Sequence, residues 1–433
     1  MREPQLIIQQ VDPETGRSRP TSVTVLPEPV TSAEAGLMVG SPPPPDLRVS
    51  RCNWMAYPHS RWSFRHMEEL GPSSRIGRGE GPVWELERAE PDETGLDLSG
   101  LEIEGDDGGT WTLDEFLRHT YTDAFLIAHR GKVVHEHYID GMTPVSRHAM
   151  FSTTKTFTGL LAMLAIHDGQ LGLDDLLVVH VPEFAGTAWE PVTVRHALDM
   201  TDGIRFEEDY ADPTSEIMRY GVAMGFIPGS RDWEGPDGIR EALCSFTERA
   251  TGPGDVFLYK SATTDALAWA TARATGRRWT ESIAERIWQP LGAATDAGIS
   301  LDPKGLEISS GGMFATAPDL LRFGLMIAAG GTTGAGTRVL PEQLVADLVE
   351  GGEPGEGHLG GYATRAGWSF HRQCWNQYRL LGTLMPMGVH GQRLLIHPEK
   401  ELVVMKLGSH PVTGNVFTDV VHERFFRDLL ARC

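Results

Sequence analysis

The spacing of apolar residues changes from a helical pattern in the middle of the chain to strand patterns toward its ends. Residues 160–166 form a continuous apolar run, which is typical of a buried helix. Residues 203–237 contain several glycines and few apolar runs, so we expect an irregular loop there. Further helices are predicted near residues 238–247, 262–275, 278–291, 318–329 and 341–350. The sequence therefore predicts an all-α lobe at about 160–350.

Strand patterns flank this lobe on both sides. After a capped helix at 112–117, residues 124–138 read as a β-hairpin that turns at Arg130 and Gly131. Strands are predicted at 378–381, 389–397 and 402–407, and a last helix at 420–430. The two strand groups pair most simply in one antiparallel sheet. We therefore predict an α+β fold, with a sheet from 111–150 and 375–433 flanked by helices beside the all-α lobe.

The N-terminal part differs from this main body, which we place at 111–433. Residues 1–50 are rich in Pro, Thr, Ser and Glu, and we expect them to be extended or disordered, with short stretches able to form a strand. Aromatic residues return in the segment 51–110, at Trp54, Tyr57, Trp62 and Phe64. Because burying these rings offsets the entropy lost on ordering, we expect this segment to pack on the main body.

Composition and charge limit the partners of the protein. The 433 residues are 40% hydrophobic and 22% charged, as in an ordinary globular protein. The formal net charge of −21, without a basic stripe, argues against a nucleic-acid partner. No stretch approaches the 18 apolar residues of a membrane span, and the N-terminus has no signal-peptide pattern. We expect a small-molecule substrate, no membrane partner and a cytoplasmic location; a homodimer is compatible with the sequence.

Metal or cofactor binding is not expected from the sequence. The four cysteines, Cys52, Cys244, Cys374 and Cys433, are scattered and form no CxxC pair, so free thiols are predicted. His135 and His137 share a face of the predicted hairpin, but no third ligand candidate lies nearby. We expect a polar strand face there and no metal site.

A Ser-x-x-Lys pair, Ser152 and Lys155, precedes the apolar run 160–166. If Ser152 lies in the first helical turn, Lys155 falls on the same face and the hydroxyl can meet the amine. The positive end of the helix dipole favours an alkoxide and disfavours an ammonium group. The same string also fits a Ser/Thr-rich helix N-terminus with a solvated lysine. The pair is thus a candidate nucleophile and base that needs support elsewhere in the chain.

Two later segments supply that support. Tyr259 follows a Gly-Pro-Gly turn and precedes the predicted helix 262–275, so its hydroxyl can project into a cleft, although a core tyrosine fits the pattern as well. Gly388 opens a predicted strand. A glycine at a strand edge lets substrate lie close to the backbone, and an edge N–H can complete an oxyanion hole.

In chain order, these segments resemble the serine β-lactamase and penicillin-binding protein superfamily: Ser152-x-x-Lys155, Tyr259-x-Ser261 and Gly388-Val389-His390-Gly391. Within it, the sequence is similar to class C β-lactamase-like esterases and most similar to 6-aminohexanoate-dimer hydrolases, from about residue 54 to the C-terminus. The resemblance implies a β-lactamase/transpeptidase-like fold.

The sequence departs from the superfamily pattern at two positions. Ser261 stands where the lactamase Tyr-x-Asn motif has Asn, and Pro386-Met387-Gly388 stands where the strand motif has Lys-Thr-Gly. We reject Lys406-Leu407-Gly408 as a substitute, because Gly388 lies at the start of the preceding strand. The absent lysine points away from binding a penicillin carboxylate.

The resemblance implies a serine hydrolase that cleaves small esters or linear amides through an acyl-enzyme on Ser152. Lys155 and Tyr259 would share the removal of the serine proton, and the N–H groups of Ser152 and Val389 would form the oxyanion hole. No metal or cofactor is required. Alternatives are a penicillin-recognising hydrolase or D-amino-acid peptidase and, from another class, a non-catalytic sensor with the same fold.

The remaining candidates concern substrate binding. The resemblance implies this role for Ser261, Gly388 and Tyr210, the last as a lid residue. His390 either lines the pocket or holds the strand. The acidic run at 207–209 could attract a substrate amine, but we prefer a solvated acidic loop.

Overall fold

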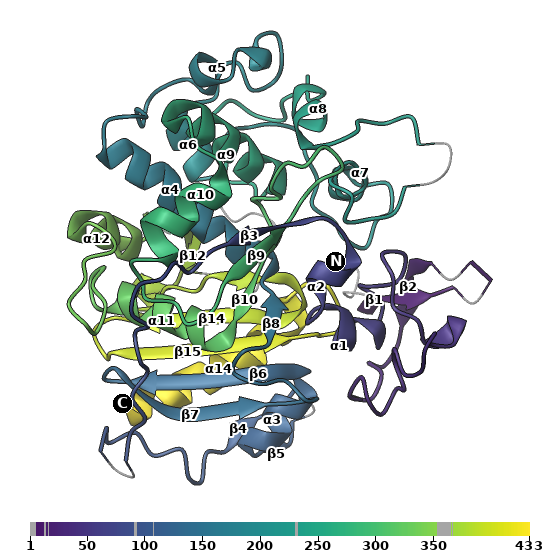
Figure 1. Cartoon of the computed structure of the whole chain (residues 1–433), viewed down its shortest axis with the longest axis vertical. Helices are drawn as coiled ribbons and strands as arrows, with labels where there is room; N and C mark the ends of the chain where they lie inside the picture. Colours follow the sequence, from purple (N-terminus) through teal and green to yellow (C-terminus); the bar gives the residue numbers. More distant parts are fainter. Residues whose placement is uncertain are drawn as a thin grey trace.

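The computed structural model describes residues 6–12, 14–15, 17–90, 93–106, 108–229, 233–352, 365 and 367–433. In these ranges the largest sheet has five antiparallel strands in the order β13-β14-β15-β6-β7 (Figure 1). They are β13 (Met387–Gly388), β14 (Gln392–His397), β15 (Leu402–Gly408), β6 (Thr122–His129) and β7 (Lys132–Tyr138). Because β15 pairs with β6, strands from both sides of the helical lobe meet in one sheet.

Alternate residues of β6 enter two different hydrophobic cores, since successive side chains of a strand point to opposite faces. Leu126 and Ala128 belong to the core that contains α11 (Ala317–Ala328). Phe125 and Ile127 belong to the core that contains α14 (Val416–Arg432). Both faces of the sheet are therefore covered, which explains why β6 is buried along its whole length.

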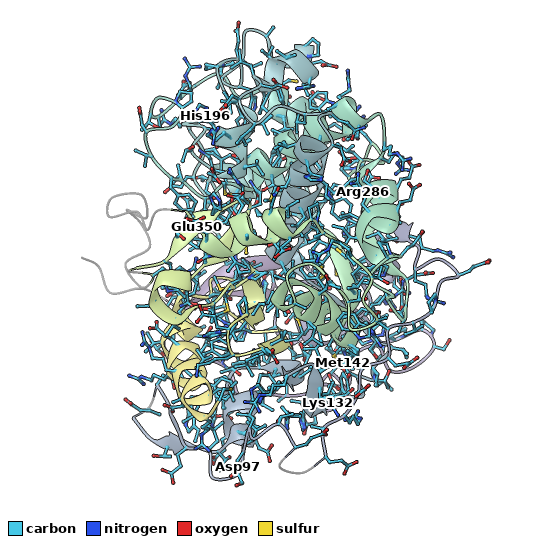
Figure 2. All side chains as sticks on the ribbon, turned by 90° about the vertical axis from the view of Figure 1, so that its left-hand side faces the viewer. Asp97, Lys132, Met142, His196, Arg286 and Glu350 are labelled. Carbon is cyan, nitrogen blue, oxygen red and sulfur yellow. The ribbon has the colours of Figure 1, made fainter. Side chains whose placement is uncertain are left out.

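The helical lobe is built around α4 (Thr154–His167) and α9 (Ser261–Thr275), which pack on each other. Residues 154–165 of α4 are all buried, so this helix has no polar stripe. Around them lie α5 (Leu177–His180), α6 (Val194–Leu198), α7 (Glu216–Ala223), α8 (Ile239–Cys244), α10 (Trp279–Ile283) and α12 (Glu342–Glu350). Figure 2 shows side chains filling the region between the lobe, where His196 is labelled, and the sheet layer with Lys132.

Smaller elements complete the fold. A four-stranded sheet has the order β3-β9-β10-β8, and β10 leads directly into α11. Its strands are β3 (Ser73–Ile76), β9 (Ala297–Ser300), β10 (Met313–Thr316) and β8 (Arg147–Ala149). The short pairs are β4 (Ile103–Glu104) with β5 (Thr110–Trp111) and β11 (Ser369–His371) with β12 (Cys374–Asn376). No helix in the described part of the chain is both long and apolar enough to cross a membrane.

Most predicted elements are present. The helix at 112–117 is α3 (Leu113–His119), which Thr112 caps with a capping box, and the hairpin turns at Arg130 and Gly131. Four predictions were wrong in detail. The range 160–350, predicted to be an all-α lobe, also contains the strands β9 and β10. The strand at 378–381 is a helical turn, α13 (Tyr378–Leu381); the predicted loop 203–237 contains α7; and residues 389–391 form a turn between β13 and β14.

The turn at 389–391 has a local cause. His390 and Gly391 both have positive φ, 61° and 93°, which a strand does not allow. At 378–381 and in α7, runs of one or two turns are too short for sequence periodicity to separate helix from strand or loop.

The N-terminal segment carries a two-stranded hairpin, β1 (Leu6–Val11) and β2 (Ser18–Val23), followed by α1 (His59–Ser63) and α2 (Met67–Leu70). Thus part of the segment predicted to be extended or disordered forms a β-hairpin. The proposed division of the chain near residues 50 and 110 stays a prediction.

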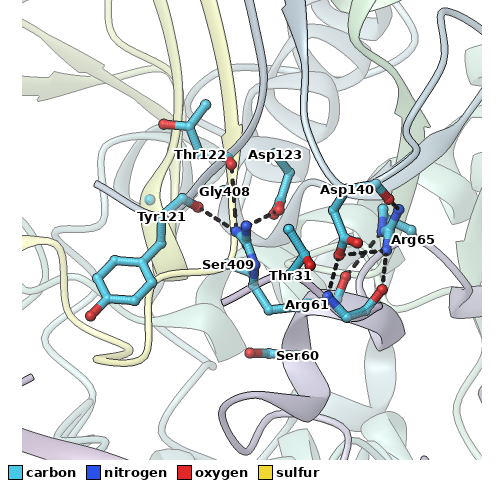
Figure 3. Close-up of polar contacts among 12 residues, drawn as sticks. Thr31, Ser60, Arg61, Arg65, Tyr121, Thr122, Asp123, Asp140, Gly408 and Ser409 are labelled. Atoms are coloured by element: carbon cyan, nitrogen blue, oxygen red, sulfur yellow. Dashed lines mark hydrogen bonds and ion pairs between the residues drawn. The ribbon is translucent and has the colours of Figure 1, made fainter. Parts of the chain in front are cut away.

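Two ion pairs fasten the segment around α1 to the main body (Figure 3). Arg61 Nη1 lies 2.7 Å from Asp123 Oδ1 at the start of β6, and Arg65 Nη2 lies 2.9 Å from Asp140 Oδ2. Arg61 also donates to the carbonyl oxygen of Tyr121. All four charged side chains of these pairs are buried. Because an unpaired buried charge is costly, these pairs allow one docking position for the segment.

Candidate active site

Ser152 occupies a short 3₁₀ helix, Phe151–Thr153, that leads directly into α4. Phe151 has φ of 46°, in the left-handed region that is unfavourable for a non-glycine residue. Its buried ring stacks on Trp54 with centroids 6.0 Å apart, and this packing holds the conformation. The bend leaves Ser152 half-buried at the wall of a cavity.

Lys155 lies one helical turn later and faces Ser152, as the spacing predicts. Its Nζ is 3.0 Å from Ser152 Oγ, 3.1 Å from Ser261 Oγ and 2.7 Å from the carbonyl oxygen of Ser310. The residue is only 1% exposed. Three oxygen acceptors match the three donors of an ammonium group, so the structure can hold Lys155 in its charged form.

The burial of Lys155 also makes the protonated form of its amine less favourable. Burial lowers the pKa of the Lys155 amine from its usual 10.5 to about 8, and the nearby carboxylates of Glu208 and Asp265 oppose this shift. An amine with this pKa exchanges protons close to neutral pH, whereas a solvated lysine does not. The alternative of a solvated lysine at a helix N-terminus is therefore wrong for Lys155.

Tyr259 reaches the site from the residues just before α9. Its ring centroid lies 5.1 Å from Lys155 Nζ, and the ring stacks on Trp375 at 5.5 Å. Phe370 packs edge-on against it. Tyr259 is half-buried and packs against the core that contains α14, and the aromatic side chains fix the plane of its ring beside the lysine.

Glu208 belongs to the site, which corrects our prediction of a solvated acidic loop. Glu207 and Asp209 are exposed, but Glu208 turns inward. Its carboxylate accepts hydrogen bonds from the Ser261 amide at 2.7 Å, from Ser261 Oγ at 3.0 Å and from the Tyr210 hydroxyl at 2.5 Å. The loop is therefore held at the start of α9, and Ser261 connects its carboxylate to Lys155.

Asp265 supports Lys155 through Ser310. It is buried, and its carboxylate accepts hydrogen bonds from the Ser310 amide at 2.9 Å, the Ser310 hydroxyl at 2.7 Å and the Tyr220 hydroxyl at 2.9 Å. Burial raises the pKa of Asp265. By fixing Ser310, Asp265 positions the carbonyl oxygen that receives the Lys155 amine.

Val389 and Ser152 line the same cavity, so the two residues predicted to form the oxyanion hole lie on one site. Gly388 precedes Val389 and has φ of −127°, which any residue can adopt. A Cβ atom at this position would overlap the carbonyl oxygen of Met150. Glycine is thus required for the close contact between β13 and the Ser152 segment, whereas we had expected it to make room for substrate.

The cavity has a volume of about 220 Å³. Apolar side chains provide most of its wall, among them Met218, Met224, Phe226 and Ile227. Tyr210 and Ser261 also line it, in agreement with their predicted place at the substrate. Such a small, mainly apolar cavity suits a short substrate segment rather than a large ligand.

Two other residues considered from the sequence lie outside the cavity wall. His390 is fully buried, and its Nδ1 lies 2.7 Å from the His410 carbonyl oxygen, so it holds the turn after β13. Burial lowers the pKa of His390 to about 4, which keeps it neutral. Lys406 is buried in β15 and donates to the carbonyl oxygens of Thr120 and Gly391. Neither side chain is positioned to contact substrate.

The predicted polar strand face is present, because the rings of His135 and His137 stack at 6.3 Å. Among the residues that the structure describes, no group of three or more His, Cys, Asp or Glu side chains could hold a metal ion. Cys244, Cys374 and Cys433 form no disulfide bond.

Sequence reasoning missed several site residues, although some left a signal. Asp265 lies four residues after Ser261, which places it on the same face of α9, and a carboxylate in this largely apolar helix is unusual. The sequence pattern could not show which of Glu207, Glu208 and Asp209 points into the site, because side chains in a loop follow no fixed period. Arg17 also lines the cavity, from a part of the chain with no recognisable motif.

Comparison with known proteins agrees with this geometry. The beta-lactamase family matches residues 112–419. The 6-aminohexanoate-dimer hydrolase of Paenarthrobacter ureafaciens is 33% identical over 363 residues, covering 83% of this chain and 88% of that protein. Among solved structures, one named "Putative 6-aminohexanoate-dimer hydrolase from Bacillus anthracis" has a TM-score of 0.79 at 26% identity, covering 88% and 96%. A family VIII carboxylesterase shares the fold, with a TM-score of 0.53 at 16% identity over 71% and 92%.

The chain belongs to the beta-lactamase family and has its β-lactamase/transpeptidase-like fold. Within that family it is a hydrolase related to 6-aminohexanoate-dimer hydrolase.

Proposed function

We propose that this protein hydrolyses small carboxylic esters or linear amides through a covalent acyl-enzyme on Ser152. The observation that carries the proposal is the 3.0 Å contact between Ser152 Oγ and the buried amine of Lys155. A lysine whose pKa is lowered to about 8 beside a hydroxyl at a cavity wall is the arrangement that activates a serine nucleophile.

In the first step, Ser152 Oγ attacks the substrate carbonyl carbon, and its proton passes to the pair formed by Lys155 and Tyr259. The C–O or C–N bond then breaks, and Tyr259 delivers a proton to the departing alcohol or amine. Proton transfer of this kind contributes about 10²- to 10⁴-fold in rate. Lys155 Nζ lies 5.1 Å from the Tyr259 ring centroid, which places the two residues close enough to share this proton transfer.

The backbone N–H groups of Ser152 and Val389 would hold the developing oxyanion, where one donor contributes roughly 3 kcal/mol. In the second step the Lys155–Tyr259 pair takes a proton from water, and the resulting attack splits the acyl ester. The carboxylic acid leaves, and the proton returns to Ser152 Oγ. These steps use groups of the protein and water alone.

Two observations support an ester or linear amide as substrate. The Paenarthrobacter relative carries the name of a 6-aminohexanoate-dimer hydrolase. The position of the missing strand lysine is occupied by Pro386, which carries no charge, so it offers no cation to a penicillin carboxylate. A penicillin-recognising hydrolase or D-amino-acid peptidase is the weaker alternative, and an inactive sensor is disfavoured because Ser152, Lys155 and Tyr259 are all in place.

A panel of three substrates tests the proposal: p-nitrophenyl butyrate, the linear 6-aminohexanoate dimer and a chromogenic cephalosporin. We expect turnover of the ester or of the linear amide, slow or no cephalosporin hydrolysis, and an acyl group on Ser152 in quenched reactions by mass spectrometry. Ser152→Ala should abolish turnover, and Ser99→Ala, which changes an exposed serine, should not. Turnover that survives in Ser152→Ala would disprove the mechanism, and rapid cephalosporin hydrolysis would reverse the ranking of substrates.

A further inference from the structure

The N-terminal hairpin forms part of the wall of the Ser152 cavity. Gln9 of β1, Pro20 of β2 and Arg17 between the strands line it together with Ser152. The hairpin lies before the residues that match the beta-lactamase family, which begin at residue 112. This chain therefore adds a wall to its active-site cavity from outside the family domain.

The hairpin is fixed at two places beside the site. Ile8 forms an antiparallel bridge with Val412, next to Thr413, which itself lines the cavity. On the other side, Arg17 Nη2 donates to the carbonyl oxygens of Pro228 at 3.3 Å and Gly229 at 2.7 Å. The hairpin thus connects the segment that follows β15 to the segment that follows α7.

Arg17 is the only charged side chain among the described residues that line the cavity. Its partners there are neutral carbonyl groups, which orient the guanidinium without cancelling its charge. No carboxylate in the described part of the chain forms an ion pair with Arg17. Only one of the three guanidinium nitrogens makes these two bonds, and an arginine fork can offer its other N–H donors to a carboxylate.

The apolar wall of the cavity would strengthen an ion pair between Arg17 and a carboxylate. Arg17 is partly buried, and mainly apolar side chains, including Met218, Phe226 and Ile227, line the same cavity. A charge pair in this lower-dielectric space attracts more strongly than one at an exposed surface. The cavity wall thus carries both a serine hydroxyl and a permanent cation.

We propose that Arg17 is a specificity-determining residue that binds a carboxylate of the substrate, so that the enzyme prefers esters or amides with a short apolar chain between the reacting carbonyl and an anionic end. The inference rests on the proposed hydrolysis at Ser152 and names the substrate class for that site. It also explains how a site without the strand lysine of the superfamily can still recognise an anion, from a different direction and with a different residue.

Paired substrates test this inference. In the first pair the carboxylate is on the acyl side: mono-p-nitrophenyl adipate against p-nitrophenyl methyl adipate. In the second it is on the leaving group: 4-(hexanoyloxy)benzoate against its methyl ester. We expect the wild type to prefer the acid in at least one pair, and Arg17→Gln to reduce the ratio of kcat/KM for acid and methyl ester roughly 10- to 100-fold, mainly through KM. The pair that responds shows on which side of the reacting bond Arg17 acts.

Two variants separate recognition from a structural role. Arg17→Lys keeps a charge and should retain part of the preference. Arg19→Gln changes the exposed arginine of the same hairpin, which pairs with Asp12, and should leave the ratio unchanged. Equal losses on acid and methyl ester in Arg17→Gln, or no preference in either pair, would overturn the inference. If no ester is hydrolysed and Ser152 is never acylated, the proposed function fails instead.

Discussion

Ser261 Oγ lies 3.0 Å from the Glu208 carboxylate, which belongs to a loop 53 residues earlier in the chain. The same hydroxyl lies 3.1 Å from Lys155 Nζ. A hydroxyl can accept a hydrogen bond from an amine and donate one to a carboxylate at the same time, so Ser261 connects the Glu208 carboxylate to the Lys155 amine. Ser261, which stands where the superfamily motif has Asn, therefore makes hydrogen bonds to both Lys155 and Glu208. The bonds to Glu208 also hold the loop that carries Tyr210.

The first prediction concerns the pH dependence of hydrolysis. Burial lowers the pKa of Lys155 to about 8, so below this pH the amine is protonated and accepts a proton poorly. We expect kcat/KM for p-nitrophenyl butyrate to rise with pH and to level off above an apparent pKa close to 8. A profile that is flat between about pH 6 and pH 9 would contradict this role.

The second prediction concerns Glu208. The carboxylate opposes the lowering of the Lys155 pKa, so Glu208→Gln should move the rising limb of the pH profile to lower pH. The variant also weakens the charged hydrogen bonds to Ser261, and kcat/KM should fall roughly tenfold. Glu207→Gln, at the exposed neighbouring position, is the matched control and should change neither quantity. A drop in activity without a shift of the limb would mean that Glu208 only holds the loop.

The third prediction concerns Gly388. An added methyl group would meet the Met150 carbonyl oxygen, so Gly388→Ala must move β13 away from the Ser152 segment. Overpacking of this kind costs about 1–3 kcal/mol of unfolding free energy, and displacing the oxyanion donor should lower kcat about 100-fold. Thermal unfolding and ester kinetics check both effects. Gly81→Ala is the control and should behave like the wild type, because nothing lies within 4 Å of the new Cβ. Normal activity in Gly388→Ala would exclude a role for the close contact between Gly388 and Met150.

The catalytic centre was predictable because its parts are local patterns. Ser152 and Lys155 are one helical turn apart, Tyr259 directly precedes a helix, and Gly388 directly precedes Val389 at a strand end. Each pattern alone is weak evidence for a catalytic site. Their occurrence in the order found in the superfamily makes the prediction stronger. The roles of these residues in catalysis remain predictions until the kinetics above are measured.

The supporting residues were less visible for a physical reason. Glu208 is one of three acidic residues in a row, and only the fold decides that its side chain turns inward to Ser261 while Glu207 and Asp209 face water. The strand predicted at 389–397 begins at Gln392, because His390 and Gly391 adopt positive φ in a turn that packs on residues distant in sequence. Neither outcome depends on local periodicity.

By itself, the sequence determined the elements and the reacting groups: the buried helix behind Ser152, the hairpin at Arg130, and the absence of any basic stripe for nucleic acid. Periodicity and short-range spacing carry that information because helices and strands are local structures. Only the tertiary structure decided that burial lowers the pKa of Lys155, that the carboxylates of Glu208 and Asp265 lie near it, and that Arg17 lines the cavity. Burial, charge proximity and cavity shape arise from contacts between residues far apart in the chain, which no local pattern encodes.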